Sequence, residues 1–181
     1  ASEFEDLPQS GMYLYALTLR PDACNRDGTL LTNLVIRLST TSKNPDALSR
    51  VFAENVGPDQ MEVYRRPLGS VSGHGICVPG FPPEPTSWDQ DQFILGLQFP
   101  YSPSKGNLLM DIQYSGKMPL FTRGAVMDAQ TLTNDGVSRV YGCPFYAETA
   151  QVADTTGLVV QFLFVRPELA IRPSESGITV E

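Results

Sequence analysis

Apolar and polar residues alternate with a period of two along much of the chain, which is the pattern of β-strands. The segment from Gly11 to Arg20 predicts a strand with both faces partly covered. One face would carry Tyr13, Tyr15, Leu17 and Leu19, and the other Leu14, Ala16 and Thr18. A second strand is predicted where Leu34, Ile36 and Leu38 alternate with Val35, Arg37 and Ser39, and we expect Arg37 to face solvent.

The most regular alternation lies in the middle of the chain. Two strands are predicted there, joined by a turn at 102–106, and we interpret them as a hairpin at the centre of the core. The first would bury Phe93, Leu95, Leu97 and Phe99 on one face, and the second Leu108, Met110, Ile112 and Tyr114. Further strands are predicted near 121–127, 137–141 and 157–165, and one or two short ones in 169–181.

One short helix is predicted from Asn44-Pro45-Asp46, with Leu48, Val51 and Phe52 at helical spacing before Gly57. Two weaker strands, 61–66 and 68–72, flank Pro67, which lacks an amide donor and favours a sheet edge. Many short strands with little helix indicate an all-β fold, a β-sandwich of jelly-roll-like type with one short helix; a barrel is the alternative. We expect one domain over 1–167, followed by a linker or the start of a further segment at 168–181.

Composition supports a globular domain and removes several function classes. The chain has 181 residues, of which 41% are hydrophobic and 18% charged, and no apolar stretch is long enough to cross a membrane. Its net charge is -7 and no basic run interleaves with aromatic residues, so nucleic acid is not an expected partner. The distant Cys24, Cys77 and Cys143 lack the spacing of a zinc site; two of them pair as a disulfide, or all three are buried thiols.

Several blocks of the chain resemble, in order and spacing, bacterial exported proteins of the PEP-CTERM type. The blocks are Ala1–Phe4 with Leu17–Asp22, Ile36–Lys43, Phe52–Gly57, Tyr101–Asp111 and Asp154–Gln161. This resemblance implies export and a cell-surface or matrix setting, and it supplies no catalytic residues. The chain departs from the family in its cysteines and in lacking the Pro-Glu-Pro sorting tail. The mid-chain triplet Pro83-Glu84-Pro85 has no apolar helix after it, so we interpret it as coincidence.

Two groups of residues were considered for catalysis. His74, the only histidine, lies near Ser72 and Cys77, but no motif such as Gly-x-Ser-x-Gly surrounds it. Asp89 and Asp91 are the candidate carboxylate pair for glycoside hydrolysis, but their spacing alone is weak evidence and favours solvated loop residues. We therefore expect no enzyme activity.

Two kinds of binding site are predicted instead. Calcium is a candidate cofactor, held by oxygen ligands from Glu5 and Asp6 before the first strand and Asp154 before the last. Carbohydrate is a candidate ligand of the long loop after Gly73, because exposed aromatic rings hold sugars and neighbouring polar groups orient them. The expected ligand-binding residues are Trp88, Phe81, Tyr101, Asp89, Gln90 and Gln92; alternatively, Trp88 fills one end of the fold.

These features together predict a non-catalytic secreted or cell-surface module. We expect it to bind carbohydrate or to act as an adhesive domain of an extracellular matrix, with polysaccharide or other surface proteins as partners. The alternative is a structural or assembly subunit that pairs through its edge strands. A hydrolase is the third hypothesis.

Overall fold

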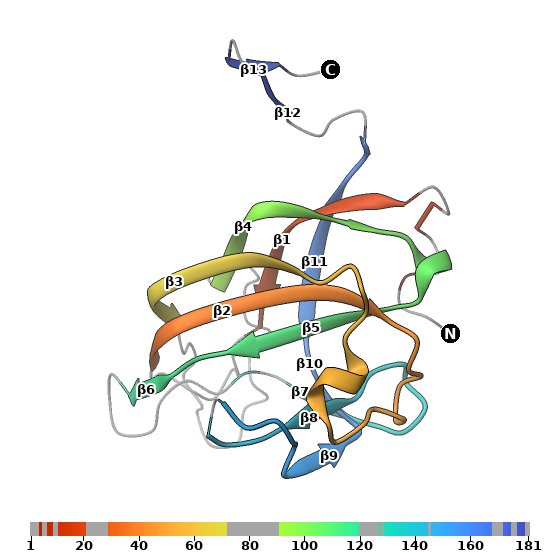
Figure 1. Cartoon of the computed structure of the whole chain (residues 1–181), viewed down its shortest axis with the longest axis vertical. Helices are drawn as coiled ribbons and strands as arrows, with labels where there is room; N and C mark the ends of the chain where they lie inside the picture. Colours follow the sequence, from red (N-terminus) through yellow and green to blue (C-terminus); the bar gives the residue numbers. More distant parts are fainter. Residues whose placement is uncertain are drawn as a thin grey trace, which may run out of the picture.

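The protein is built from antiparallel β-strands, as shown by a computed structural model (Figure 1). The structure describes residues 4, 7–8, 11–20, 29–71, 91–119, 127, 129–144, 146–167, 172–174 and 177–179. Its only helical elements within these ranges are two 3-10 turns, η1 (Phe52–Asn55) and η2 (Pro103–Lys105). The predicted all-β class is therefore confirmed.

Two larger sheets form the body of the molecule. The first has the strand order β11-β1-β4, with β1 (Met12–Leu19) between β4 (Asp91–Tyr101) and β11 (Val160–Val165). The second has the order β3-β2-β5, with β2 (Thr29–Thr41) between β3 (Met61–Val71) and β5 (Asn107–Gln113). β6 (Gly116–Pro119) also pairs with the first residues of β2.

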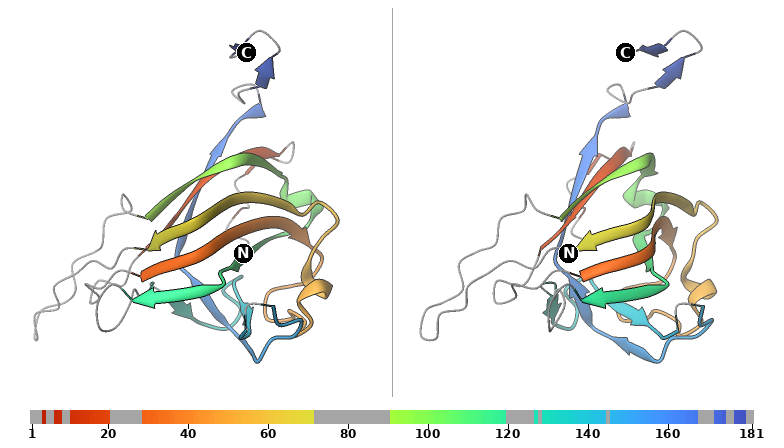
Figure 2. Two further views of the ribbon diagram at one scale, coloured as in Figure 1. Left: turned by 60° about the vertical axis from the view of Figure 1, so that its left-hand side comes forward. Right: turned by 90° about the vertical axis from the view of Figure 1, so that its left-hand side faces the viewer.

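Three strand pairs lie outside these sheets. β7 (Ala129–Thr131) pairs with β10 (Thr156–Leu158), and β8 (Arg139–Tyr141) pairs with β9 (Val152–Asp154). β12 (Arg172–Ser174) and β13 (Gly177–Thr179) pair with each other beyond the end of β11 (Figures 1 and 2). In the described part of the chain, no helix has the length and apolar character needed to cross a bilayer.

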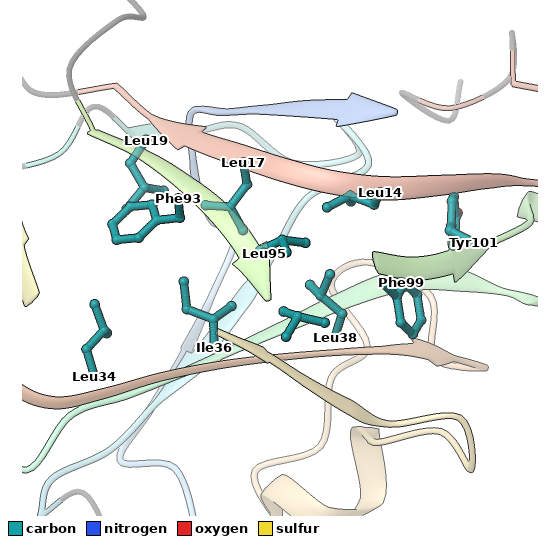
Figure 3. Close-up of a cluster of buried hydrophobic side chains, with 11 residues drawn as sticks. Leu14, Leu17, Leu19, Leu34, Ile36, Leu38, Phe93, Leu95, Phe99 and Tyr101 are labelled. Carbon is teal, nitrogen blue, oxygen red and sulfur yellow. The ribbon is translucent and has the colours of Figure 1, made fainter. Parts of the chain in front are cut away.

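One hydrophobic core lies between the two larger sheets (Figure 3). β1 and β4 supply Leu14, Leu17, Leu19, Phe93, Leu95, Phe99 and Tyr101, and the facing strands supply Leu34, Ile36, Leu38 and Val63. Each fully buried side chain of this size contributes about 1.5–3 kcal/mol through removal of its apolar surface from water. The contact between these layers is therefore the main source of stability.

A bulge in β1 changes the predicted faces of that strand. Leu14 pairs with Phe164 and Ala16 with Leu163, so Tyr15 is an extra residue relative to β11. A one-residue shift exchanges the two faces of a strand. Leu14 therefore joins Leu17 in the core, whereas strict alternation placed these two leucines on opposite faces.

The predicted hairpin of the two central strands is wrong. β4 pairs with β1 and β5 pairs with β2, so the connection between β4 and β5 crosses from one sheet to the other. The Tyr101 hydroxyl donates to the Gly106 carbonyl oxygen (3.2 Å), and the Asn107 amide donates to the Lys43 carbonyl oxygen (2.9 Å). The second bond ties the start of β5 to the segment that follows β2.

The predicted helix at 44–57 is also wrong, because only the turn η1 forms. Asp46 has a φ of 64°, outside the helical region, and Val51 makes an isolated β-bridge with Thr149. The Phe52 amide donates to Glu148, so backbone groups that an α-helix would use internally are bonded to a distant segment.

β3 runs through Pro67 as one strand and lies at the edge of its sheet, as the proline predicted. At this side of the molecule β3 lies beside β4, the edge of the other sheet, without pairing with it (Figures 1 and 2). This closeness also fits the alternative of a barrel, so the jelly-roll-like sandwich stays a prediction. The strands predicted at 137–141, 157–165 and 169–181 are present as β8, β10, β11, β12 and β13, whereas residues 121–126 lie outside the described part of the chain.

Truncation of Phe99 tests the core assignment. Phe99 is fully buried, so Phe99→Ala is expected to lower the free energy of unfolding by about 3–5 kcal/mol, as for other large core deletions. The matched control is Leu97→Ala on the same strand, where the side chain is 57% exposed; we expect a change below about 0.5 kcal/mol. Urea denaturation measures both, and equal losses would contradict the assignment.

Candidate functional site

A groove of about 340 Å³ opens on the surface where β3 and β4 lie side by side. Five consecutive residues of β3, Glu62 to Arg66, form one wall of this β3–β4 groove. The other wall consists of Ile94, Gly96 and Leu97 of β4. The groove therefore combines charged, aromatic and aliphatic side chains.

A bulge in β4 brings Leu97 into the apolar wall. Phe99 pairs with Leu14 and Ile94 with Ala16, so residues 95–98 of β4 lie opposite Tyr15 alone. The extra residues bend the strand outward. Leu97, predicted to share a buried face, is consequently 57% exposed. Ile94 is 68% exposed because it alternates with the buried Phe93 and Leu95.

Gly96 lets the bulge approach β3 closely. A Cβ atom at Gly96 would lie 3.7 Å from the Val63 carbonyl oxygen, which is ordinary van der Waals contact. Next to it, the Tyr64 ring packs against Phe93 with centroids 5.2 Å apart and planes at 90°. The Arg66 guanidinium carbon lies 5.9 Å from the centroid of the same ring, so Tyr64 contacts both the core and the groove's cation.

The arginines of the groove differ in their partners. Arg65 donates two hydrogen bonds to the two carboxylate oxygens of Glu62, and Arg37 Nη2 lies 3.5 Å from Glu62 Oε2. The hydrogen bond from Arg65, together with the charges of Arg65 and Arg37, lowers the pKa of Glu62 against a smaller effect of desolvation. Within the described residues, Arg66 has no carboxylate at ion-pairing distance. The groove therefore presents an uncompensated cation.

Arg37 connects Glu62 to polar residues of β5 on the outer face of the second sheet. Its Nη1 atom donates to Gln113 Oε1 (2.8 Å) and lies 3.5 Å from Asp111 Oδ2. Burial raises the pKa of Asp111, and Arg37 offsets only part of this effect. These contacts link β3, β2 and β5, and they fix the positions of both Arg37 and Glu62. Arg37 was predicted to face solvent. It does not do so freely, because its guanidinium bonds to neighbouring strands.

Comparison with protein-family models, curated proteins and solved structures gives no match to this chain. Function is therefore inferred from the geometry of the groove. The resemblance to PEP-CTERM-type proteins stays a prediction.

Most of the predicted carbohydrate site lies outside the described residues. This applies to Phe81, Trp88, Asp89 and Gln90, while Gln92 is placed in β4 opposite Thr18 by its backbone alone.

The prediction that Tyr101 binds a ligand, by contrast, is corrected. It is only 2% exposed, and its ring lies 5.4 Å from that of Phe4, centroid to centroid. Burial raises the pKa of Tyr101, whose hydroxyl is bonded to Gly106. This ring belongs to the core and not to a ligand-binding surface.

Asp154 is committed to an ion pair. Arg139 donates from Nε to Oδ1 (2.9 Å) and from Nη2 to Oδ2 (3.1 Å), and the Thr156 amide donates to Oδ1 (3.0 Å). These hydrogen bonds lower the pKa of Asp154, and the one from Arg139 has the largest effect. A metal ion at these oxygens would compete with the guanidinium cation.

The topology also separates Asp154 from Phe4, which precedes β1. Phe4 packs against Phe162 and Phe164 in β11, and the antiparallel pairing of β1 with β11 places residues that precede β11 at the opposite end. Glu5 and Asp6 lie outside the described residues. Among described side chains no three His, Cys, Asp or Glu residues come together, and calcium binding stays a prediction.

The residues considered for catalysis fall outside the described side chains. These are Ser72, His74, Cys77 and Asp89, together with the side chain of Asp91 at the start of β4. Cys24 is also outside, whereas Cys143 is an exposed free thiol and not a buried one.

Sequence reasoning did not find the β3–β4 groove, although two signals of it are present. Gly96 interrupts an otherwise bulky apolar strand, and an isolated glycine within a strand indicates a bulge or a close backbone approach. The pair Arg65-Arg66 directly precedes the edge-strand proline. Neither signal says which strand lies opposite.

The Arg139–Asp154 pair leads to a prediction about proton binding. In Arg139→Met the pKa of Asp154 should rise toward its ordinary value, as measured by NMR titration of the carboxyl carbon. Since the pKa of Asp154 is lowered in the folded state, the pair stabilises the protein above the unfolded pKa, and this contribution is lost as pH falls through the folded pKa. Arg65→Met is the control and should leave Asp154 unchanged; an unshifted Asp154 in Arg139→Met would contradict the assignment.

Proposed function

We propose that the protein is a non-catalytic interaction module that binds an extended polypeptide segment in the β3–β4 groove. The observation that carries this proposal is the exposure of Ile94 and Leu97 on a strand whose other large apolar side chains are buried. The secreted or cell-surface setting stays a prediction from the sequence.

The exposed apolar pair favours a partner with apolar side chains. Burying an isoleucine or leucine side chain from water contributes about 1.5–3 kcal/mol each. Adjacent exposed apolar residues bordered by polar groups are a common feature of interaction sites. Glu62 and Arg65 supply this polar border.

The backbone at the groove favours a polypeptide as the partner. β3 pairs with β2 on one side only, and residues 95–98 of β4 have one opposing residue in β1. Edge strands and bulges lack a ladder partner on one side, and here the edges of β3 and β4 face each other across the groove. Extended peptides bind such edges through main-chain hydrogen bonds, while side-chain pockets provide specificity.

The aromatic content of the groove argues against a sugar at this position. Sugar recognition by aromatic stacking needs an open ring face, and the one ring lining the groove, Tyr64, contacts Phe93 and Arg66. Carbohydrate binding through the Phe81–Gln92 segment therefore stays a separate prediction.

Charge suits a partner that carries a carboxylate. Arg66 lacks an anionic partner within the described residues, whereas Arg65 and Glu62 neutralise each other. The ionisable side chains of the groove serve as ion-pair or cation–π partners, which supports a binding role over catalysis. We expect bound segments to alternate apolar residues with at least one acidic residue.

Peptide selection tests this function. A random peptide library displayed on phage would be selected on the wild-type protein, and affinities of the enriched peptides measured by calorimetry. Leu97→Asp should weaken binding at least tenfold, about 1.4 kcal/mol, because it places a charge at the apolar contact. Arg66→Ala should weaken the acidic peptides selectively.

The matched control is Leu132→Asp, since Leu132 is 56% exposed but lies outside the groove. It should leave peptide affinity unchanged. Enriched peptides that bind Leu97→Asp as tightly as wild type would overturn the proposal. A glycan ligand lost on Trp88→Ala and retained on Leu97→Asp would instead support the carbohydrate prediction.

A further inference from the structure

The C-terminal hairpin, formed by β12 and β13, lies apart from the two larger sheets. β12 and β13 pair only with each other, and Figures 1 and 2 show them beyond the end of β11, away from both larger sheets. An isolated two-stranded hairpin is at best marginally stable in water. A second surface would therefore stabilise it.

From these observations, and building on the proposed function, we infer that the β3–β4 groove binds the C-terminal hairpin of a second copy of this chain. One copy would then act as donor and the next as acceptor. The donor surface and the acceptor groove are different surfaces, so this contact is head-to-tail and extends into open chains or closed rings.

The composition of the segment 168–181, which contains the hairpin, complements the groove. Residues 168–181 contain three glutamates and one arginine, and Ile178 and Val180 alternate with Thr179 and Glu181. An alternating apolar segment with acidic neighbours matches a groove that presents Ile94, Leu97 and the uncompensated Arg66.

The position of the hairpin favours a second copy over the same molecule. The hairpin follows β11, which lies at one edge of the sheet β11-β1-β4, and the groove lies at the other edge, beside β4. β1 separates the two edges. A donor segment leaving one edge and an acceptor at the opposite edge suit propagation from copy to copy.

Complementary variants test the inference with the 181-residue chain. Wild type should show a mass that rises with concentration in sedimentation equilibrium up to millimolar protein. Leu97→Asp removes the acceptor and Ile178→Asp removes the donor, so each alone should stay at the monomer mass. An equimolar mixture of the two should form a one-to-one pair and nothing larger, because only one intact contact is possible. The double variant alone should stay monomeric at every concentration.

Leu132→Asp is the matched control and should assemble like wild type, and Ile94→Asp should repeat the effect of Leu97→Asp at a second exposed position. Circular dichroism checks that each variant is folded. Assembly that persists in either single variant, or a mixture that fails to pair, would overturn the inference. A wild type that is monomeric at millimolar concentration would also overturn it, whether or not its hairpin contacts its own groove. If the groove still binds selected peptides in that case, the proposed function is retained, and only the inference that the partner is a second copy of this chain is wrong.

Discussion

The apolar contact between β1 and β4 on one side and β2 and β3 on the other holds this fold together. Fully buried side chains such as Leu14, Leu38 and Phe99 meet in this layer, and no other part of the described chain buries a comparable cluster. The strands curve and bulge to keep that contact filled. The β4 bulge retains Leu95 and Phe99 in the core while turning Leu97 to the surface, where the proposed binding groove lies.

Local patterning predicted the class of the fold well and the pairing of its strands poorly. Period-two alternation is a property of each strand alone, so β1, β2 and β11 could be read from their own residues. Pro67 likewise placed β3 at an edge, since a proline lacks a ladder donor at any central position. The partner of β4 depends on contacts between segments far apart in the chain, and alternation carries no information about them. The same limit explains the absent helix at 44–57, where bonds to residues 148–150 override a local signal.

The candidate site was less predictable than the fold for a related reason. A groove between two strands depends on register, and the bulge opposite Tyr15 is visible only once β1, β4 and β11 are paired. Residue type also predicted the binding residues poorly. Tyr101 is a core residue and Asp154 is an ion-pair partner. The residues that line the groove are ordinary ones, and what distinguishes them is their exposure and, for Arg66, the lack of a carboxylate.

The exposure of the β4 bulge decides between this groove and a regular, fully buried strand. Methyl NMR with a soluble gadolinium chelate measures it directly, because relaxation of each methyl group reports its distance from solvent. The methyls of Leu97 and Ile94 should relax strongly, while those of Leu95 and Leu14 should be protected. Protection of Leu97 equal to that of Leu95 would contradict the bulge, and with it the groove.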